Sequence, residues 1–392
     1  MGTKQFDSAT NLITFTRASS STFLGSNGLI QTATNNTPRI EYNADGTVKG
    51  LLIEEARTNL VTTSSGWNTG ATNVSFGGYT TAPDGTNTGS LFITDATGNY
   101  STNLGTVTTS STNQFVTFSV FFKKELARYA TFKINKSAFD GRFWYDFDTG
   151  NTGFKTHPYF ENRTFSVENY PNGWKRMSIS FSSSNISGVF NLNVAPSNDE
   201  PYATYNRNIT GDGTQGVYFW GAQGELASFP TSYIPTSGAT ATRAADIVSI
   251  PVADFGYNDD AGSLVIDYDT PNIQVSDRLL SLSTGFANRV FDISLSGTDL
   301  INYSDASGQI NLGSLTSAGK VAVAFESAKE FVGVKDGAVI TVDPTTTAVT
   351  RPEALYIGTW FTASDRFPNG HIKSIKYYPR RLSNAQLQEL TT

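Results

Sequence analysis

The stretch from Tyr218 to Ile250 constrains the fold of this chain more than any other feature of its sequence. An aromatic run, Tyr218-Phe-Trp-Gly221, is followed by a segment rich in Pro, Ser, Thr and Gly that leads to Ala241-Thr-Arg-Ala-Ala-Asp246. Aromatic residues favour strands, whereas Gly and Pro favour turns and loops. The pattern predicts a strand that ends at Gly221 and passes into an exposed connector between two domains.

Length and composition exclude several classes of protein. A chain of 392 residues is too long for one ordinary sandwich and predicts two or three domains. Cysteine is absent, which excludes disulfides and thiolate metal sites. The net charge is −6 and no Lys/Arg cluster occurs, so we expect no nucleic-acid partner. No apolar run is long enough to span a bilayer, so we expect no membrane insertion.

Short strands joined by turns dominate the rest of the sequence. Segments that alternate or run apolar between turn residues predict strands. They lie at residues 115–122, 129–134, 142–147, 174–181, 217–220, 262–268, 278–282, 289–295, 320–325 and 331–341. One helix is expected near residues 383–390, where Ser383 is placed to cap the N-terminus and Leu387 and Leu390 share a face. The sequence therefore predicts an all-β protein of tandem antiparallel β-sandwiches (jelly rolls) with one short C-terminal helix.

Residues 1–60 form a short β-rich N-terminal leader. The pairs Asn27-Gly28 and Asp45-Gly46 are typical of hairpin turns between short strands. Three short strands bury too little apolar surface to be stable alone. The leader is therefore expected to need a neighbour, either the next domain or another subunit. We assign residues 61–240 to the first sandwich and residues 241–392 to the second.

Three groups of short sequence segments resemble known families. The segments 16–19, 37–40 and 50–60, with Thr16-Arg-Ala-Ser19 and Thr37-Pro-Arg-Ile40, resemble a leader common in bacteriophage tail and head-fibre proteins. The segments 59–60, 118–123, 173–176 and 220–223 resemble those of carbohydrate-binding jelly-roll modules of the type 4/9 kind. The ending, residues 355–358 and 370–383, resembles concanavalin A-like, laminin-G-type domains.

Taken together, these resemblances imply a bacteriophage virion protein, such as a tail or head fibre, a spike or a head decoration. Its localisation would be the particle surface, and its partners other virion proteins and host cell-surface glycan. Weak binding at each site would be raised by multivalent display. A homo-oligomer, with a trimer favoured, would shelter leader strands and sheet edges. The alternatives are a purely structural decoration protein that binds only other virion proteins, and a glycan depolymerase or glycosidase.

Sugar recognition requires aromatic faces together with amide and carboxylate groups. In the segment 142–148, alternation places Arg142, Trp144, Asp146 and Asp148 on one face and Phe143, Tyr145 and Phe147 on the other. The first group is the leading candidate for a glycan platform. The alternative is that Trp144 packs under a loop or at a subunit interface.

Further candidates lie in two loop regions. Trp67 and Tyr79 occur in a turn-rich segment and are placed to rim a groove. The loop before the final strand contains Trp360, Asp365, Arg366, Asn369 and His371, in a place where laminin-G-like domains hold ligand or calcium. The alternative for this loop is a solvated segment held by the packing of Trp360.

No catalytic constellation is apparent. A glycosidase needs two carboxylates facing one cleft, and lectin-like glycosidases present a Glu-x-Asp-x-x-Glu run that this sequence lacks. His157 and His371 are far apart and fall in different predicted domains, which disfavours a two-His metal site or a triad. We therefore expect no enzymatic activity and no cofactor. Calcium bound with loop carbonyls by an Asp-x-Asp pair on one strand face, Asp146 and Asp148 or Asp267 and Asp269, stays open as an alternative.

Overall fold

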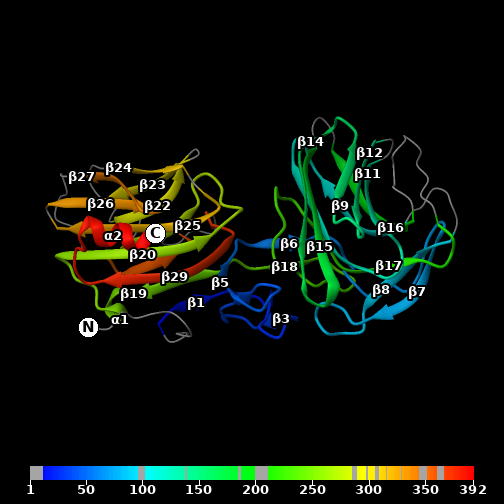
Figure 1. The fold of residues 1–392 in the computed structure, drawn as a ribbon, viewed down its shortest axis with the longest axis horizontal. Coiled ribbons are helices and arrows are strands. Elements are labelled where there is room, and N and C mark those ends of the chain that lie inside the picture. The colour runs from blue at the N-terminus through cyan, green and yellow to red at the C-terminus, as the bar shows by residue number, and fades with distance from the viewer. Residues whose placement is uncertain are drawn as a thin grey trace.

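The computed structural model describes residues 12–95, 102–136, 139–183, 187–198, 211–284, 289–296, 299–304, 309–314, 316–327, 329–343, 351–359 and 366–392. Strands account for 57% of the chain and helices for 5%, and all the strand pairs are antiparallel, which confirms the all-β sandwich fold. Two lobes lie side by side (Figure 1). Among the described residues, no helix has the length and apolar character needed to cross a membrane.

The first lobe packs a six-stranded sheet, in the order β14-β15-β10-β17-β8-β7, against a five-stranded sheet, in the order β13-β12-β11-β16-β9. Inward side chains such as Phe118, Phe132 and Phe190 are fully buried between the two sheets. A single 3₁₀ turn, Pro171–Gly173, joins β14 to β15. The strands are β7 (Val74–Thr80), β8 (Gly89–Thr94), β9 (Asn103–Thr109), β10 (Phe115–Lys124), β11 (Tyr129–Lys136), β12 (Phe139–Asp146), β13 (Thr152–Thr156), β14 (Phe160–Asn169), β15 (Trp174–Ser183), β16 (Gly188–Ser197) and β17 (Gly216–Glu225).

The second lobe packs two seven-stranded sheets, in the orders β1-β19-β28-β21-β22-β23-β24 and β27-β26-β25-β20-β29-β5-β4. Its core is aliphatic, with Leu264, Ile266 and Ile293 buried between the sheets. Its own elements are β19 (Ile247–Pro251), α1 (Val252–Phe255), β20 (Ala261–Asp269), β21 (Arg278–Ser283), β22 (Arg289–Ser296), β23 (Asp299–Ser304), β24 (Gln309–Ser314), β25 (Ala318–Glu326), β26 (Glu330–Lys335), β27 (Ala338–Asp343), β28 (Ala354–Ile357), β29 (Gly370–Tyr378) and α2 (Asn384–Thr391).

The predicted C-terminal helix of this lobe is confirmed. Ser383 caps α2, because its side chain accepts the backbone N–H of Gln386 while the Gln386 side chain accepts the N–H of Ser383. Leu387 is fully buried against the outer side of the β20 sheet. Asp336 and Gly337 both have positive φ, at 46° and 79°, and join β26 to β27 as a tight hairpin turn.

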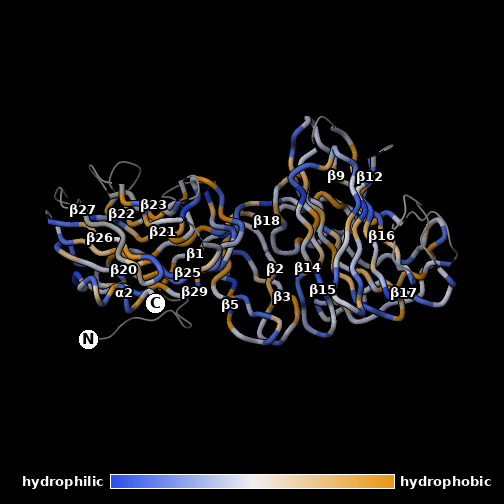
Figure 2. The backbone as a smooth tube through the Cα atoms, turned by 45° about the horizontal axis from the view of Figure 1, so that its top comes forward, coloured by the Kyte–Doolittle hydropathy of each residue, from blue (hydrophilic) through white to orange (hydrophobic). Residues whose placement is uncertain are grey.

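The leader belongs structurally to the second lobe. Its strand β1 (Thr14–Thr16) pairs with β19, and β5 (Val48–Ile53), itself paired with β4 (Ile40–Tyr42), pairs with β29. The hairpin of β2 (Ser21–Leu24) and β3 (Ile30–Ala33) lies between the lobes (Figure 2). Strand β6 (Arg57–Asn59) pairs with β18 (Ala241–Arg243) where the chain passes from lobe to lobe (Figure 1). The neighbour that these strands require is thus supplied by the same chain, from its far end.

The connector, expected to be exposed, is largely buried over residues 227–236 and exposed at residues 237–240, so the expectation was wrong for its first part. Strand β17 does not end at Gly221 but bulges there, with φ +64°, and continues to Glu225. Tyr233 then folds back so that its ring lies 4.6 Å from the ring of Trp220. The Asn59 side chain donates to the carbonyl of Ile234 at 2.9 Å. Side chains thereby satisfy a backbone that has no strand partner, which allows burial of a Ser- and Pro-rich segment.

Five charged side chains meet where the leader, the connector and the second lobe converge. This junction cluster consists of Arg17, Arg39, Glu54, Arg243 and Asp246. Arg39 lies 2.8 Å from Glu54 and 2.5 Å from Asp246, and Arg17 lies 3.0 Å from the other oxygen of Asp246. Arg243 reaches Glu54 at 3.4 Å. The side chains of Arg39 and Asp246 are 0% exposed, so the cluster is a dry ionic network.

Each of the three leader segments 16–19, 37–40 and 50–60 contributes one charged residue to the junction cluster. Arg17, Arg39 and Glu54 each come from one of those segments, and Arg243 and Asp246 come from the end of the connector. Burial alone would raise the pKa of Glu54, but Arg243 and Arg39 outweigh it and hold that pKa well below its usual range. Glu54 is therefore a carboxylate at neutral pH, and it links leader and connector.

Candidate functional site

Strand β12 carries the predicted platform at the surface side of the five-stranded sheet. Phe143 and Tyr145 point into the core of the first lobe. Arg142, Trp144 and Asp146 therefore lie on the opposite side of the sheet, as the alternation predicts. In the register, Trp144 pairs with Thr131 of β11 on one side and with Gly153 of β13 on the other.

The indole of Trp144 lies over the backbone of the neighbouring edge strand. A Cβ atom built on Gly153 would be 2.2 Å from Cζ2 of Trp144, so only glycine leaves room for the ring. Trp144 is half-buried and also packs against the core cluster of the first lobe. The ring is thus fixed in one orientation while part of it remains accessible to solvent.

A row of asparagine amides continues this surface across β11 and β16. Asn193 donates to the side-chain oxygen of Asn135 at 2.5 Å, and Asn191 donates to the Asn135 carbonyl at 3.3 Å. Asn103 of β9 donates to the side-chain oxygen of Asn191 at 3.3 Å. The alternation of Asn191 and Asn193 with Leu192 indicates that both lie on one side of a strand, but their contact with Asn135 arises only from the pairing of β16 with β11. We call the surface formed by Lys133, Asn135, Arg142, Trp144, Asn191 and Asn193 the outer face.

Arg142 is held by its own strand. Its guanidinium lies 2.6 Å from Asp140, with a second bond from Nε at 3.1 Å, and its side chain is almost completely buried. The register places Lys133 between Arg142 and Asn193. Arg142 and Asn193 are buried, whereas Lys133, Asn135, Trp144 and Asn191 are partly exposed. The accessible part of the outer face therefore combines one cation, two amides and one aromatic ring on one sheet.

The two aspartates of the predicted platform stabilise a turn. Asp146 is buried, binds Arg128 at 2.8 Å and accepts the backbone N–H of Asp148 at 2.9 Å. The hydrogen bond from Arg128 lowers the pKa of Asp146 well below its usual range. Asp148 lies beyond the end of β12, with its side chain 52% exposed, and pairs with Lys124 at 2.6 Å. Among the described residues, no group of three or more His, Cys, Asp or Glu side chains is placed to hold a metal ion.

Trp67 and Tyr79 are brought close to each other. Tyr79 lies on strand β7, is 40% exposed, and donates its hydroxyl to the carbonyl of Gly66 at 3.2 Å. Trp67 lines a pocket of about 280 Å³ together with Asn103 and Thr106 of β9. Since Asn103 also bonds to Asn191, this pocket lies at the edge of the outer face.

The candidates of the second lobe separate into two groups. Trp360 and Asp365 lie outside the described residues. Arg366, with φ +78°, accepts the backbone N–H of Arg278 through its carbonyl at 3.1 Å. Asn369 is buried and ties the leader to this loop, because its side chain accepts the N–H of Glu55 at 3.0 Å and donates to Phe367 at 2.9 Å. Asn369 therefore has a structural role at the leader contact.

Known proteins resemble this chain only distantly. No family model matches the sequence, and the search among curated proteins finds no match. A carbohydrate-binding module of a Ruminococcus gnavus sialidase, bound to α2,3-sialyllactose, is similar at 15% identity and TM-score 0.31, over 34% of this chain and 84% of that one. Domain 4 of a Geobacillus stearothermophilus arabinanase, in complex with arabinotriose, is similar at 13% identity and TM-score 0.29, over 42% and 82%.

The Trypanosoma rangeli sialidase in complex with sialic acid is similar at 11% identity and TM-score 0.31, over 100% of this chain and 98% of that one. The carbohydrates in these structures are ligands of those proteins. With TM-scores below 0.5, these similarities assign no family, ligand or activity to this chain.

Proposed function

We propose that this chain is a non-enzymatic bacteriophage virion protein whose first lobe binds host-surface glycan through the outer face. The observation that carries the proposal is that the half-buried indole of Trp144 lies on the same side of the sheet as the partly exposed amides of Asn135 and Asn191. Pyranose C–H groups pack on an aromatic ring, and amides form paired hydrogen bonds with sugar hydroxyls. The virion location rests on the resemblance of the leader segments to phage fibre proteins.

Affinity at one outer face is expected to be weak, because the site is an open sheet surface. Display of many copies on a particle would raise the effective affinity without any new contact. We propose a homo-oligomer, a trimer by preference, since β4, β7 and β13 each lie at the end of a sheet and have backbone groups that another chain can pair with. Sedimentation analysis of the full chain measures this state.

The binding test uses the full chain displayed at high valency on a glycan array and on host cells. We expect Trp144→Ala to lower binding about fivefold or more, taking stacking of nucleic-acid bases on aromatic side chains, on the order of 1–3 kcal/mol, as the guide. Phe115→Ala, at a partly exposed aromatic on the other sheet, is the matched control and should bind normally. Absence of binding to every glycan and host at high valency would refute adhesion and favour a purely structural decoration protein.

Two further measurements test the absence of catalysis and of calcium. Asp146 and Asp148 are paired with Arg128 and Lys124, so we expect binding to be unchanged by a chelator and no reducing ends to be released from host polysaccharide. Release that disappears in the Asp146→Asn, Asp148→Asn double variant would contradict the proposal and establish a depolymerase.

A further inference from the structure

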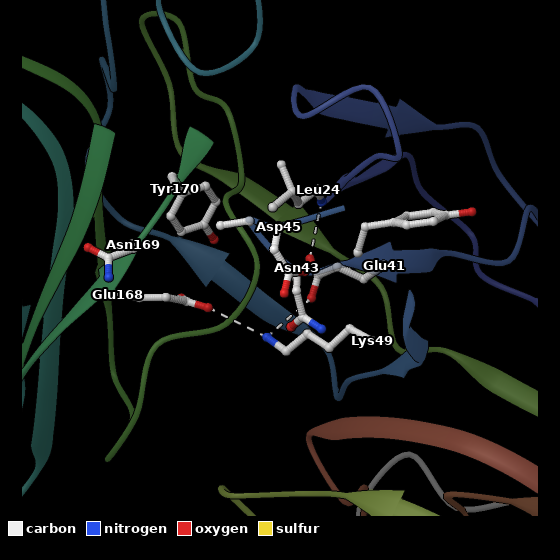
Figure 3. Close-up of a pocket in the computed structure, with 10 residues that line it drawn as sticks. Leu24, Glu41, Asn43, Asp45, Lys49, Glu168, Asn169 and Tyr170 are labelled. Carbon is white, nitrogen blue, oxygen red and sulfur yellow. Dashed lines mark hydrogen bonds and ion pairs between the residues drawn. The ribbon is translucent and has the colours of Figure 1, made fainter. Parts of the chain in front are cut away.

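A second polar pocket lies where the leader meets the first lobe. It has a volume of about 390 Å³ and lies between the β4–β5 hairpin and the end of β14 (Figure 3). Glu41 and Lys49 enter it from the leader, and Glu168 and Tyr170 enter it from the first lobe. This volume is within the range of small-ligand sites, roughly 300–1,000 Å³.

Glu41 is oriented in this pocket by fixed partners. One carboxylate oxygen accepts the backbone N–H of Leu24 at 3.1 Å, and the other lies 2.7 Å from Nε2 of His371 on β29. Burial raises the pKa of Glu41, but the hydrogen bond and charge of His371 outweigh it and lower that pKa. Glu41 is therefore a pre-oriented acceptor at neutral pH.

Lys49 lies between two carboxylates without a tight bond to either. Its Nζ atom is 3.8 Å from Glu41 and 3.5 Å from Glu168, and its side chain is 26% exposed. Direct hydrogen bonds of this type measure about 2.7–3.2 Å. Burial lowers the pKa of Lys49, but Glu168 and Glu41 outweigh it and raise that pKa, so the group is a cation with donors directed at the pocket.

This arrangement selects a ligand by its hydrogen-bonding capacity. Carboxylates only accept and an ammonium only donates, whereas a sugar hydroxyl does both and is able to bridge them. Glu41, Asp45 and Glu168 outnumber Lys49, which disfavours an anionic ligand. The ring of Tyr170 and the side chain of Leu24 add apolar surface for the C–H groups of a sugar ring.

We propose that this junction pocket is a second saccharide site, which holds the hydroxyl groups of one neutral sugar residue among Glu41, Lys49 and Glu168. It shares no residue with the outer face, so the two sites bind independently. A sugar bound here contacts the leader and the first lobe together, and Glu41 extends the contact through His371 to the second lobe. Binding is therefore expected to stabilise the contact between the lobes as well.

The test uses the full chain with Trp144→Ala, so that failure of the outer face is separated from failure of this pocket. The probes are the methyl glycosides of glucose, galactose, mannose and N-acetylglucosamine, followed by saturation-transfer NMR and calorimetry. We expect at least one to bind saturably, and Lys49→Met to weaken it about tenfold or more, because a hydrogen bond to a charged group is lost. Lys373→Met, at a half-exposed lysine 4.0 Å from Asp269, is the matched control.

Glu168→Gln is the second variant, since its side chain is exposed and its replacement leaves the fold intact. We expect the same weakening of the neutral glycoside as for Lys49→Met. Three results would overturn the proposal: no saturable binding by any of the four probes, binding that both variants leave unchanged, or tighter binding of methyl glucuronide than of every neutral glycoside.

Discussion

The five side chains of the junction cluster depend on one another because each carboxylate is shared between arginines. Arg39 is the central member, since it contacts both Glu54 and Asp246 and also donates to the hydroxyl of Ser232 at 2.8 Å. Removing one partner from a buried ion network leaves the remaining charges without compensation, which costs more than the network contributes as a whole.

Arg39→Met should therefore lower the free energy of unfolding by about 3–5 kcal/mol. The methionine keeps the aliphatic volume but removes the cation closest to both carboxylates, since Arg243 lies 3.4 Å from Glu54 and 3.9 Å from Asp246. Urea unfolding followed by fluorescence measures the change. Arg380→Met, at an exposed arginine, is the control and should change stability little. Equal effects of the two substitutions would show that the cluster is not coupled to stability.

Acid should destabilise the chain through Glu54. Its pKa in the folded state is below the usual value of 4.5, so its stabilisation is fully present above that pH and is lost as pH falls further. We expect the Tm of the native chain to decrease once the pH is lower than about 4.5. Glu54→Gln should have a lower Tm at pH 7, and its Tm should decrease less as the pH falls. Thermal melts from pH 7 to pH 3 measure both.

Glu161→Gln provides the control for that experiment, because Glu161 is an exposed carboxyl on β14. It should retain the pH dependence of the native chain. A Glu54→Gln variant with an unchanged slope would assign the acid sensitivity to other carboxylates.

At the scale of single elements, the bulge at Gly221 lets β17 continue from the first lobe into the connector. A side chain there would adopt a disfavoured φ, and its Cβ would lie 2.8 Å from the ring of Phe121. Gly221→Ala is expected to destabilise the chain by roughly 1–3 kcal/mol. Gly46→Ala, at φ +84° in open space, isolates the backbone contribution, so the difference in unfolding free energy measures packing against Phe121. No difference would refute the packing role.

Strands whose residues alternate were predictable, and surfaces assembled from several strands were not. The alternation in β12 correctly placed Phe143 and Tyr145 in the core opposite Trp144. The amide row escaped prediction because Asn135 and Asn193 are distant in sequence and become neighbours only through the pairing of β11 with β16. Asp148 was misplaced because β12 ends at Asp146, where Arg128 binds and a turn begins.

The connector was mispredicted for a different reason. Pro, Ser and Thr usually indicate exposed loops, but here the backbone N–H of Ser232 donates to Glu54 and that of Thr236 donates to Ser64. Those partners come from other parts of the chain, so no local pattern reveals them. The destination of the leader strands was hidden in the same way, because pairing of Leu52 with His371 is non-local.

At the scale of the whole molecule, the leader completes the second lobe. Removing residues 1–56 deletes β1, β4 and β5, and with them Phe15 and Ile53 from the core. We expect calorimetry of the shortened chain to show the transition of the second lobe lost or shifted to much lower temperature. The first lobe should be destabilised less, through loss of Ile30 from its contacts with Trp220 and Tyr233. Removing only residues 1–11 keeps every described strand and is the control.

An unchanged melting profile after removal of residues 1–56 would show that the second lobe folds without its added strands. Limited proteolysis with mass spectrometry identifies which lobe has become accessible. Cleavage concentrated after residue 246 would agree with the expected loss, because the remaining strands of the second lobe lie there.

Glu41 and His371 touch although 330 residues separate them in the chain. At ribosomal rates of about 5–20 residues per second, the leader emerges tens of seconds before the strand it must pair with. The first lobe has all its strands by then and is able to fold while synthesis continues. The leader strands have unpaired edges during this interval, so we expect the nascent chain to be prone to aggregation until the last strand leaves the ribosome.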